Sequence, residues 1–131
     1  MFLTKECDYG IRTIRALANG EKKTVGTICD LEQIPFQYAY KILKKLEHAQ
    51  LVQGMRGRDG GYTLVKPLDQ ITLYDIVSAI DESLFLFECL QGHHVCVRNH
   101  AEQLCTIHPE LGRIQSVLIA EMQRKTLQEL F

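Results

Sequence analysis

Residues 35–65 place a helix pattern directly before a glycine-rich hairpin pattern, and few folds accommodate that order. Within 35–50 the apolar positions fall on one side of a helical wheel: Phe36, Ala39, Ile42, Leu43 and Leu46. The other side carries hydrogen-bonding and basic residues: Gln37, Tyr40, Lys41, Lys44 and His48. This arrangement predicts a helix over 36–49 with one buried face and one exposed basic face.

The stretch LVQGMRGRDGGYTLV, residues 51–65, contains two short β-like runs joined by RGRDGG. Glycines at 57, 60 and 61 permit the positive φ angles of a tight or bulged hairpin. Arg56 and Arg58 are expected to project from its tip. The sequence therefore predicts a small β-hairpin with a basic end.

Two helices are predicted before this region. In the first, apolar residues recur at spacings of 4, 4, 3 and 4 and stop near Asn19 and Gly20: Leu3, Cys7, Ile11, Ile14 and Ala18. The second is shorter and begins at Thr24, a good N-cap. It carries the apolar residues Val25, Ile28 and Leu31 before Pro35 ends it.

Two further helices are predicted after the hairpin. Residues 72–75 form a capping box, with Asp75 in place of glutamate, which opens a helix through Ile80. Pro109 occupies a first-turn position, where its missing N–H costs nothing, and opens the last helix. One stripe of that helix is apolar: Leu111, Ile114, Leu118 and Met122.

The order of these elements fits a mostly α-helical fold with a small β-hairpin wing, a winged helix-turn-helix followed by a long C-terminal helix. In that fold helix 36–49 enters the major groove of DNA, where Gln37 and Tyr40 can bond to base edges or phosphates. Lys41 and Lys44 can neutralise phosphates, and the arginine-tipped hairpin reaches a neighbouring groove. Taken singly, the lysines also fit a solvated helix face, and the glycines fit an ordinary turn.

The charge distribution agrees with an anionic partner for the first half. Residues 1–67 carry 11 Lys and Arg against 7 Asp and Glu, whereas residues 68–131 carry 4 against 9. A basic half suits a nucleic acid, and the acidic half indicates a different role. The N-terminus has no apolar leader, and the runs LFLF (84–87) and VLIA (117–120) are too short to cross a membrane. We therefore expect a cytoplasmic protein without a membrane partner.

Residues 89–108, CLQGHHVCVRNHAEQLCTIH, hold three of the five cysteines and four of the five histidines. A cytosolic compartment keeps thiols reduced, so a disulfide framework is not expected. Thiolates are the ligands of iron-sulfur clusters, and zinc sites usually show a tighter pair of cysteines than C-x6-C-x8-C. Cys89, Cys96 and Cys105 are thus candidate cluster ligands, with a metal-free thiol switch, zinc or no ligand as alternatives. Cys7 and Cys29 are predicted core thiols.

Three stretches carry a family resemblance: LTKECDYGIRTIRALA (3–18), IPFQYAYKILKKLEHAQLVQGMRGRDGGYTLVKP (34–67) and ITLYDIVSAID (71–81). They resemble the Rrf-type family of bacterial winged-helix transcriptional regulators, which includes an iron-sulfur cluster regulator and a nitric-oxide-sensing repressor. The resemblance implies a homodimer that contacts operator DNA through the recognition helix and the wing. The implied contact residues are Gln37, Tyr38, Tyr40, Lys41, Lys44, Arg56 and Arg58.

The resemblance also implies an organisation for the chain. Residues 1–82 are expected to bind DNA, 83–108 to form a cluster-binding loop and 109–131 to form a dimerisation helix. By resemblance the stripe from Leu111 to Met122 joins two subunits; otherwise it only closes the local core.

The same family implies that the three loop cysteines bind a [2Fe-2S] or [4Fe-4S] cluster, with a fourth ligand from His108 or from Asp8 across the dimer. Operator affinity would then respond to redox state, nitric oxide or iron and sulfur supply. A metal-free regulator that uses the cysteines as a thiol switch, or for protein contacts, is the alternative. An enzyme with a Cys–His pair is not expected, because no third orienting residue and no oxyanion-hole motif are present.

Overall fold

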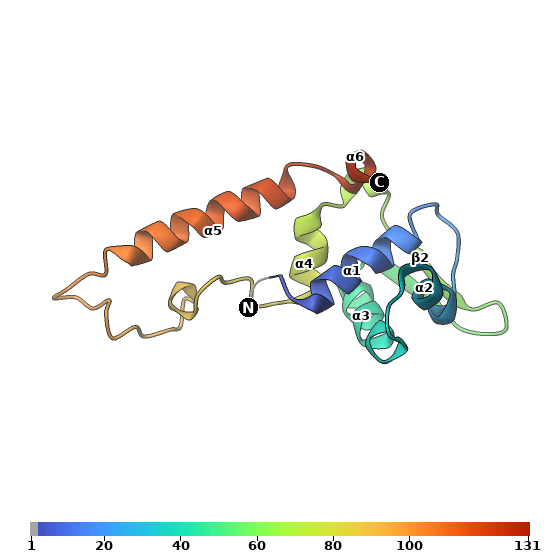
Figure 1. Ribbon diagram of the computed structural model, residues 1–131, viewed down its shortest axis with the longest axis horizontal. Helices are drawn as coiled ribbons and strands as arrows, with labels where there is room; N and C mark the ends of the chain where they lie inside the picture. Colours follow the sequence, from blue (N-terminus) through green and yellow to red (C-terminus); the bar gives the residue numbers. More distant parts are fainter. Residues whose placement is uncertain (1–2) are drawn as a thin grey trace.

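The structure is a computed structural model that describes residues 3–131; Met1 and Phe2, part of the expected DNA-binding segment 1–82, lie outside the described residues. Four helices pack around one core: α1 (Lys5–Ala16), α2 (Val25–Glu32), α3 (Phe36–His48) and α4 (Leu73–Ile80). Strands β1 (Val52–Met55) and β2 (Gly61–Leu64) form an antiparallel hairpin that extends from this body (Figure 1). The predicted fold class, a mostly helical chain with a hairpin wing, is confirmed.

The core is built from the apolar faces of the helices. Its fully buried side chains include Ile14, Leu17, Ile28, Ile42, Leu43, Leu46 and Ile76. The predicted face of α3 is therefore correct, except at Phe36, whose side chain is 56% exposed. Phe36 is the first residue of α3 and lies beyond the edge of the core. Leu3 differs as well, because it precedes the N-cap Thr4 and is exposed instead of lying on α1.

The wing follows the predicted register. Val52 pairs with Leu64 and Met55 with Gly61, so residues 56–60 form the connection. Gly57 and Gly61 have φ angles of 109° and 153°, as a glycine-dependent turn requires. Gly60 has another role, because a Cβ there would lie 2.6 Å from the carbonyl oxygen of Met55. The tight backbone approach at Gly60, and not a positive φ angle, excludes larger residues.

Beyond α4 the chain forms an arm that extends away from the body (Figure 1). Residues 81–106 run outward as a loop with one short 3₁₀ turn, η2 (Glu88–Leu90), and α5 (Ile107–Gln123) returns beside it. The backbone N–H of Leu86 donates to Gln115 Oε1 at 2.9 Å, which fixes the loop to the helix. Helix α5 begins at Ile107, before Pro109, so it includes His108.

The sequence predicted one continuous C-terminal helix, and this prediction is wrong. Helix α5 ends at Gln123, and a short helix α6 (Leu127–Leu130) follows, opened by a capping box between Thr126 and Glu129. The N–H of Leu127 donates to the carbonyl of Ile71 at 2.7 Å, and the Leu127 side chain is fully buried. The chain end therefore packs back on the body near the 3₁₀ turn η1 (Leu68–Gln70). No helix within residues 3–131 is long and apolar enough to span a bilayer.

Replacing Leu127 with alanine tests this return of the chain end. Because Leu127 is completely buried, we expect the free energy of unfolding to fall by about 2–5 kcal/mol in urea denaturation. Leu130 lies in the same short helix and is 43% exposed, so Leu130→Ala should change stability by less than about 0.5 kcal/mol. Equal, small effects of the two variants would show that α6 does not dock on the body.

Candidate nucleic-acid interface and cysteine pocket

Helix α3 owes its orientation to a short turn after α2. Gln33 ends α2 in the left-handed conformation, with φ at 54°. The N–H of Ile34 then bonds to the carbonyl of Cys29 at 3.1 Å, and the Ile34 side chain is buried. This turn directs the outer face of α3 to the surface. All five helix residues predicted to contact DNA are exposed there: Gln37, Tyr38, Tyr40, Lys41 and Lys44.

The positive charge on α3 is partly neutralised by α1. Lys41 Nζ lies 2.7 Å from Glu6 Oε1, and Lys45 Nζ lies 3.2 Å from Glu6 Oε2. The hydrogen bond from Lys41 is the main reason that the pKa of Glu6 lies below its ordinary value, so this carboxylate is charged at neutral pH. Lys44 forms no ion pair within residues 3–131. Lys44 therefore offers a free charge, whereas a phosphate has to compete with Glu6 for Lys41.

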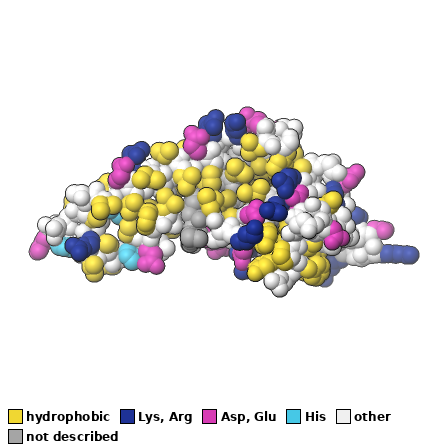
Figure 2. Space-filling model, in the orientation of Figure 1, with side chains coloured by type: hydrophobic (Ala, Val, Ile, Leu, Met, Phe, Trp, Pro, Cys, Tyr) yellow, Lys and Arg dark blue, Asp and Glu magenta, His cyan; other side chains and the backbone are white. Residues whose placement is uncertain are grey.

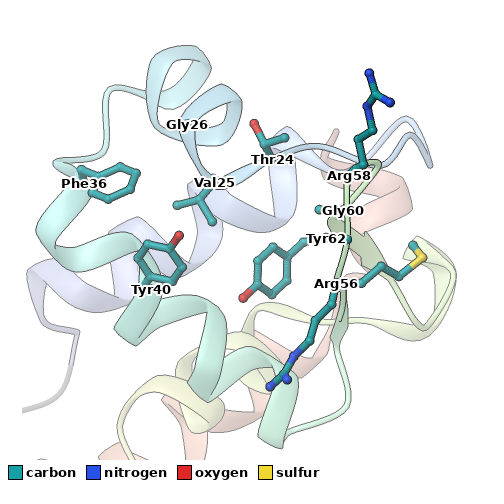
Figure 3. A pocket seen from close by; sticks show the side chains of 12 residues that line it. Thr24, Val25, Gly26, Phe36, Tyr40, Arg56, Arg58, Gly60 and Tyr62 are labelled. Atoms are coloured by element: carbon teal, nitrogen blue, oxygen red, sulfur yellow. The ribbon is translucent and has the colours of Figure 1, made fainter.

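The wing carries two more cations beside a groove that α3 also lines. Arg56 and Arg58 are exposed, and neither pairs with a carboxylate of the described chain. Their side chains extend from the hairpin in different directions (Figure 3). The hairpin itself is anchored, because Lys23 and Tyr62 exchange two backbone hydrogen bonds of 3.0 and 2.8 Å. The arginines are therefore carried at a set distance from α2 and α3.

A groove of about 480 Å³ separates the wing from the two helices, and we call it the wing groove. Its walls come from α2 and the preceding residue, from α3 and from the hairpin: Thr24, Val25, Gly26, Phe36, Tyr40, Met55, Arg56, Gly57, Arg58, Gly60, Gly61 and Tyr62. Burial raises the pKa of the Tyr62 hydroxyl, which therefore keeps its proton and can donate a hydrogen bond. Phe36, Tyr62 and Thr24 belong to this surface although the sequence pattern did not predict it.

A second hollow lies in the arm and is called the cysteine pocket. It has a volume of about 400 Å³ and is lined by Cys89, Leu90, Gln91, Gly92, His94, Val95, Cys96, Asn99 and His108. The Nδ1 atom of His108 is buried and has no hydrogen-bond partner among the described residues. Such an unpaired polar atom is costly in a folded protein. Two of the predicted thiol ligands and the predicted histidine thus share one pocket.

Cys105, the third predicted thiol ligand, does not line the pocket. Its backbone N–H donates to Asn99 Oδ1 at 3.1 Å, and Asn99 is itself a pocket residue. Within residues 3–131, no three His, Cys, Asp or Glu side chains are arranged closely enough to hold a metal ion. The three loop cysteines are free thiols of intermediate exposure. Cys89, Cys96, Cys105 and His108 carry the donor atoms that an iron-sulfur cluster requires. Cys105 has to move toward Cys89 and Cys96 before all three thiolates can bind one cluster.

Asp8, the alternative fourth ligand, has partners of its own. Its carboxylate pairs with Arg12 at 3.0 Å and with Lys5 at 3.2 Å. Partial burial acts to raise the pKa of Asp8, but these two cations outweigh it and the net shift is downward. Asp8 is not a residue of the cysteine pocket. The remaining thiols, Cys7 and Cys29, are buried as predicted, and burial raises the pKa of Cys29.

Helix α5 presents much of its apolar surface to solvent. Of the predicted stripe, Met122 is buried, Leu111 and Leu118 are partly buried, and Ile114 is 42% exposed. Val117 beside them is 51% exposed. Hydrophobic side chains spread over the face that includes α5 in Figure 2. Within this chain, therefore, only the end of the stripe near Met122 is covered by the core.

Comparison with known proteins adds a family and a set of similar structures. The family model Rrf2, described as an iron-dependent transcriptional regulator, matches residues 3–131. Protein aau3 of Rhizobium meliloti (strain 1021) is 35% identical over 97 residues, which cover 72% of this chain and 63% of that protein. The matched part of the chain thus spans less than two thirds of that curated relative.

The structural neighbours share the fold at low sequence identity. CymR (YrzC), the global cysteine regulator of B. subtilis, aligns with a TM-score of 0.75 and 21% identity over 99% of this chain and 95% of its own. T. potens IscR aligns with a TM-score of 0.73 and 17% identity over 99% and 85% of the two chains. The oxidized form of Staphylococcus aureus CymR gives 0.72 and 20% over 99% and 95%. At these identities the likeness concerns the fold alone.

Proposed function

The chain belongs to the Rrf2 family of iron-dependent transcriptional regulators, and we propose that it binds operator DNA as a homodimer whose affinity is set by an iron-sulfur cluster. The family resemblance stated from the sequence is thereby confirmed. Members of this family regulate transcription and are not enzymes, which removes the Cys–His enzyme from consideration.

The observation that carries the DNA contact is the set of cations around the wing groove. Arg56 and Arg58 line the groove, and Lys44 is exposed on α3, the helix that contributes Phe36 and Tyr40 to its wall. No carboxylate of the described chain neutralises these three cations. Guanidinium and ammonium groups that neutralise phosphates release the counterions condensed on the DNA, which supplies a large share of the binding affinity. Gln37, Tyr38 and Tyr40 then lie on the exposed face of α3, where base edges can be contacted.

For the cluster, we propose Cys89, Cys96 and Cys105 as thiolate ligands and His108 as the fourth ligand. The unpaired, buried Nδ1 of His108 beside two of these thiols supports this set. Asp8 of the partner subunit stays the alternative, and its pairing with Arg12 and Lys5 disfavours it. When bound, such a group supplies an iron centre that reacts with nitric oxide or oxygen and changes redox state. The cluster type, [2Fe-2S] or [4Fe-4S], follows from which fourth ligand is used.

A thiol switch without metal is the second candidate. It is favoured by the position of Cys105 outside the pocket and by the partial exposure of all three loop thiols. An oxidized form of a regulator with the same fold, from Staphylococcus aureus, is among the structural neighbours. In this alternative the DNA-binding face is the same, and only the signal differs.

A direct contact joins the DNA-binding face to the loop. Lys45 of α3 donates to the carbonyl of Ile80 at 2.7 Å, and Ile80 is the last residue of α4, where the 81–106 loop begins. Lys45 also pairs with Glu6, which holds Lys41. We propose that a change in the loop shifts α3 through this network. Residues 1–82 then serve DNA binding and 83–108, which include the first two residues of α5, serve sensing. The rest of α5, from Pro109 onward, serves dimerisation, and α6 docks on the body.

The DNA contact is tested by Arg56→Ala, Arg58→Ala and Lys44→Ala. Each should weaken operator binding and lower the slope of log K against log salt by about one, because each loses one phosphate contact. Fluorescence anisotropy with a labelled operator over a salt series measures both quantities. Arg124→Ala is the matched control, since Arg124 is an exposed arginine beyond α5 that pairs with Glu121. Unchanged affinity and slope in all three variants would remove the proposed DNA-binding face.

A further inference from the structure

Phe36 is a large, 56% exposed apolar side chain on the wall of the groove that carries Arg56 and Arg58. Its ring forms an edge-to-face pair with Tyr40, with ring centres 5.4 Å apart and an interplanar angle of 84°. Both rings line the wing groove opposite the hairpin that carries Arg56 and Arg58 (Figure 3). A single exposed apolar side chain is common on protein surfaces. The exposure of Phe36 calls for an explanation because the ring lines a groove that carries two arginines.

The pair is held in place before any ligand arrives. Phe36 and Tyr40 are four residues apart on α3, a spacing at which helical side chains meet. Two residues after Phe36, Tyr38 packs against Tyr9 of α1, with ring centres 5.5 Å apart, which anchors the first turn of α3 to the body. The Phe36 ring is therefore a fixed apolar feature at the start of the recognition helix.

The charges around the pair identify its partner. The same groove holds two arginines that no carboxylate of the described chain neutralises, and the N-terminal half of the sequence is basic. Double-stranded DNA matches this charge. It also offers a partner for the ring, because the C5 methyl of thymine is the apolar group on the base edges of the major groove, and phenylalanine is among the side chains that contact it.

We propose that Phe36, positioned by Tyr40, reads the C5 methyl group of one thymine in each operator half-site. This inference rests on the proposed DNA binding and adds a specificity contact to it. The arginines and lysines supply affinity for any sequence, whereas the ring distinguishes thymine from bases that present no methyl group. Phe36 is then a DNA-contacting residue, although the helical pattern by itself predicted a core position for it.

The experiment uses the full chain and operators selected by it from a random duplex library. Each thymine of the selected operator is replaced in turn with deoxyuridine, which keeps the base pair and removes only the methyl group. At one position per half-site we expect an affinity loss of about fourfold, the effect of one buried methyl-sized group. Phe36→Ala should bind the thymine and the deoxyuridine operators with equal, reduced affinity. Phe36→Leu should keep part of the preference for thymine. Phe87→Ala, an exposed phenylalanine in the arm, should keep all of it.

A second measurement needs no variant. The sensitive thymine is replaced with 5-iodouracil, which matches the methyl group in size, and irradiation should cross-link it to a peptide that contains Phe36. Methyl discrimination that persists in Phe36→Ala, or a cross-link to the wing instead, overturns the inference and leaves DNA binding intact. Failure of the chain to enrich any sequence or to bind duplex DNA overturns the proposed function, and this inference with it.

Discussion

Replacing Cys89, Cys96 or Cys105 with alanine is expected to abolish the visible absorbance that the wild-type protein acquires on anaerobic reconstitution with iron and sulfide. Each thiolate is a soft anionic ligand, and the neighbouring histidines and amides do not replace it. Cys29→Ala is the control, because Cys29 is buried in the core and should leave the absorbance unchanged. Full absorbance in all three loop variants would show that these cysteines are not the ligands.

The fourth ligand has a different signature from the thiolates. His108→Ala should still assemble a coloured protein but shift its absorption and its redox potential, because the variant loses the proposed fourth ligand atom. That atom is the buried Nδ1 of His108, which has no hydrogen-bond partner among the described residues. Asp8→Ala should change neither property, since Asp8 is paired with Arg12 and Lys5. The reverse result would assign the ligand to Asp8.

Operator affinity decides between the two proposed signals. Reconstituted protein, apo protein and the triple cysteine variant should differ in affinity if the cluster is the switch. If instead only mild oxidation of the apo protein changes its affinity, and a reducing thiol reverses the change, the thiol switch is the mechanism. Identical affinity under all of these conditions would leave the loop cysteines without a role in DNA binding.

Introducing a charge on α5, as Ile114→Glu or Leu118→Glu, is expected to convert the protein to monomers. Ile114 and its neighbour Val117 are substantially exposed apolar residues, and an ionised carboxylate buried between two such helices has no partner. A monomer contacts only one half-site, so its affinity for a palindromic operator should fall toward the nonspecific level, on the order of 10³-fold weaker. Sedimentation velocity and anisotropy measure the two effects.

A matched control lies on the same helix. Ser116 is exposed on the side of α5 opposite Leu118, so Ser116→Glu should preserve both the dimer and operator binding. Because Ile114 is not part of the closed core, its charged variant should keep the circular dichroism spectrum of the wild type. A dimer that tolerates glutamate at 114 and at 118 would place the interface elsewhere.

The elements that the sequence predicted well are those formed by local interactions. The apolar face of α3 follows from a 3.6-residue period, and the start of α4 follows from the Thr72–Asp75 capping box, whose hydrogen bonds close within one turn. The left-handed backbone at Gly57 and Gly61 is likewise a local property. The capping box of α6, Thr126 followed by Glu129, is also a local sequence signal. The prediction of a single long helix overlooked it.

By itself, then, the sequence determined the helices α1 to α4, the wing, the basic face of α3 and the grouping of soft ligands in residues 89–108. Tertiary structure decided which residues meet across the chain. Phe36 satisfies the helical period of a core residue, but it lies beyond the core edge and faces the groove. Glu6 neutralises Lys41 from another helix, and Cys89, Cys96 and His108 share a pocket that excludes Cys105. Periodicity specifies the direction of a side chain within its own element, whereas the contacts it makes depend on elements distant in the sequence.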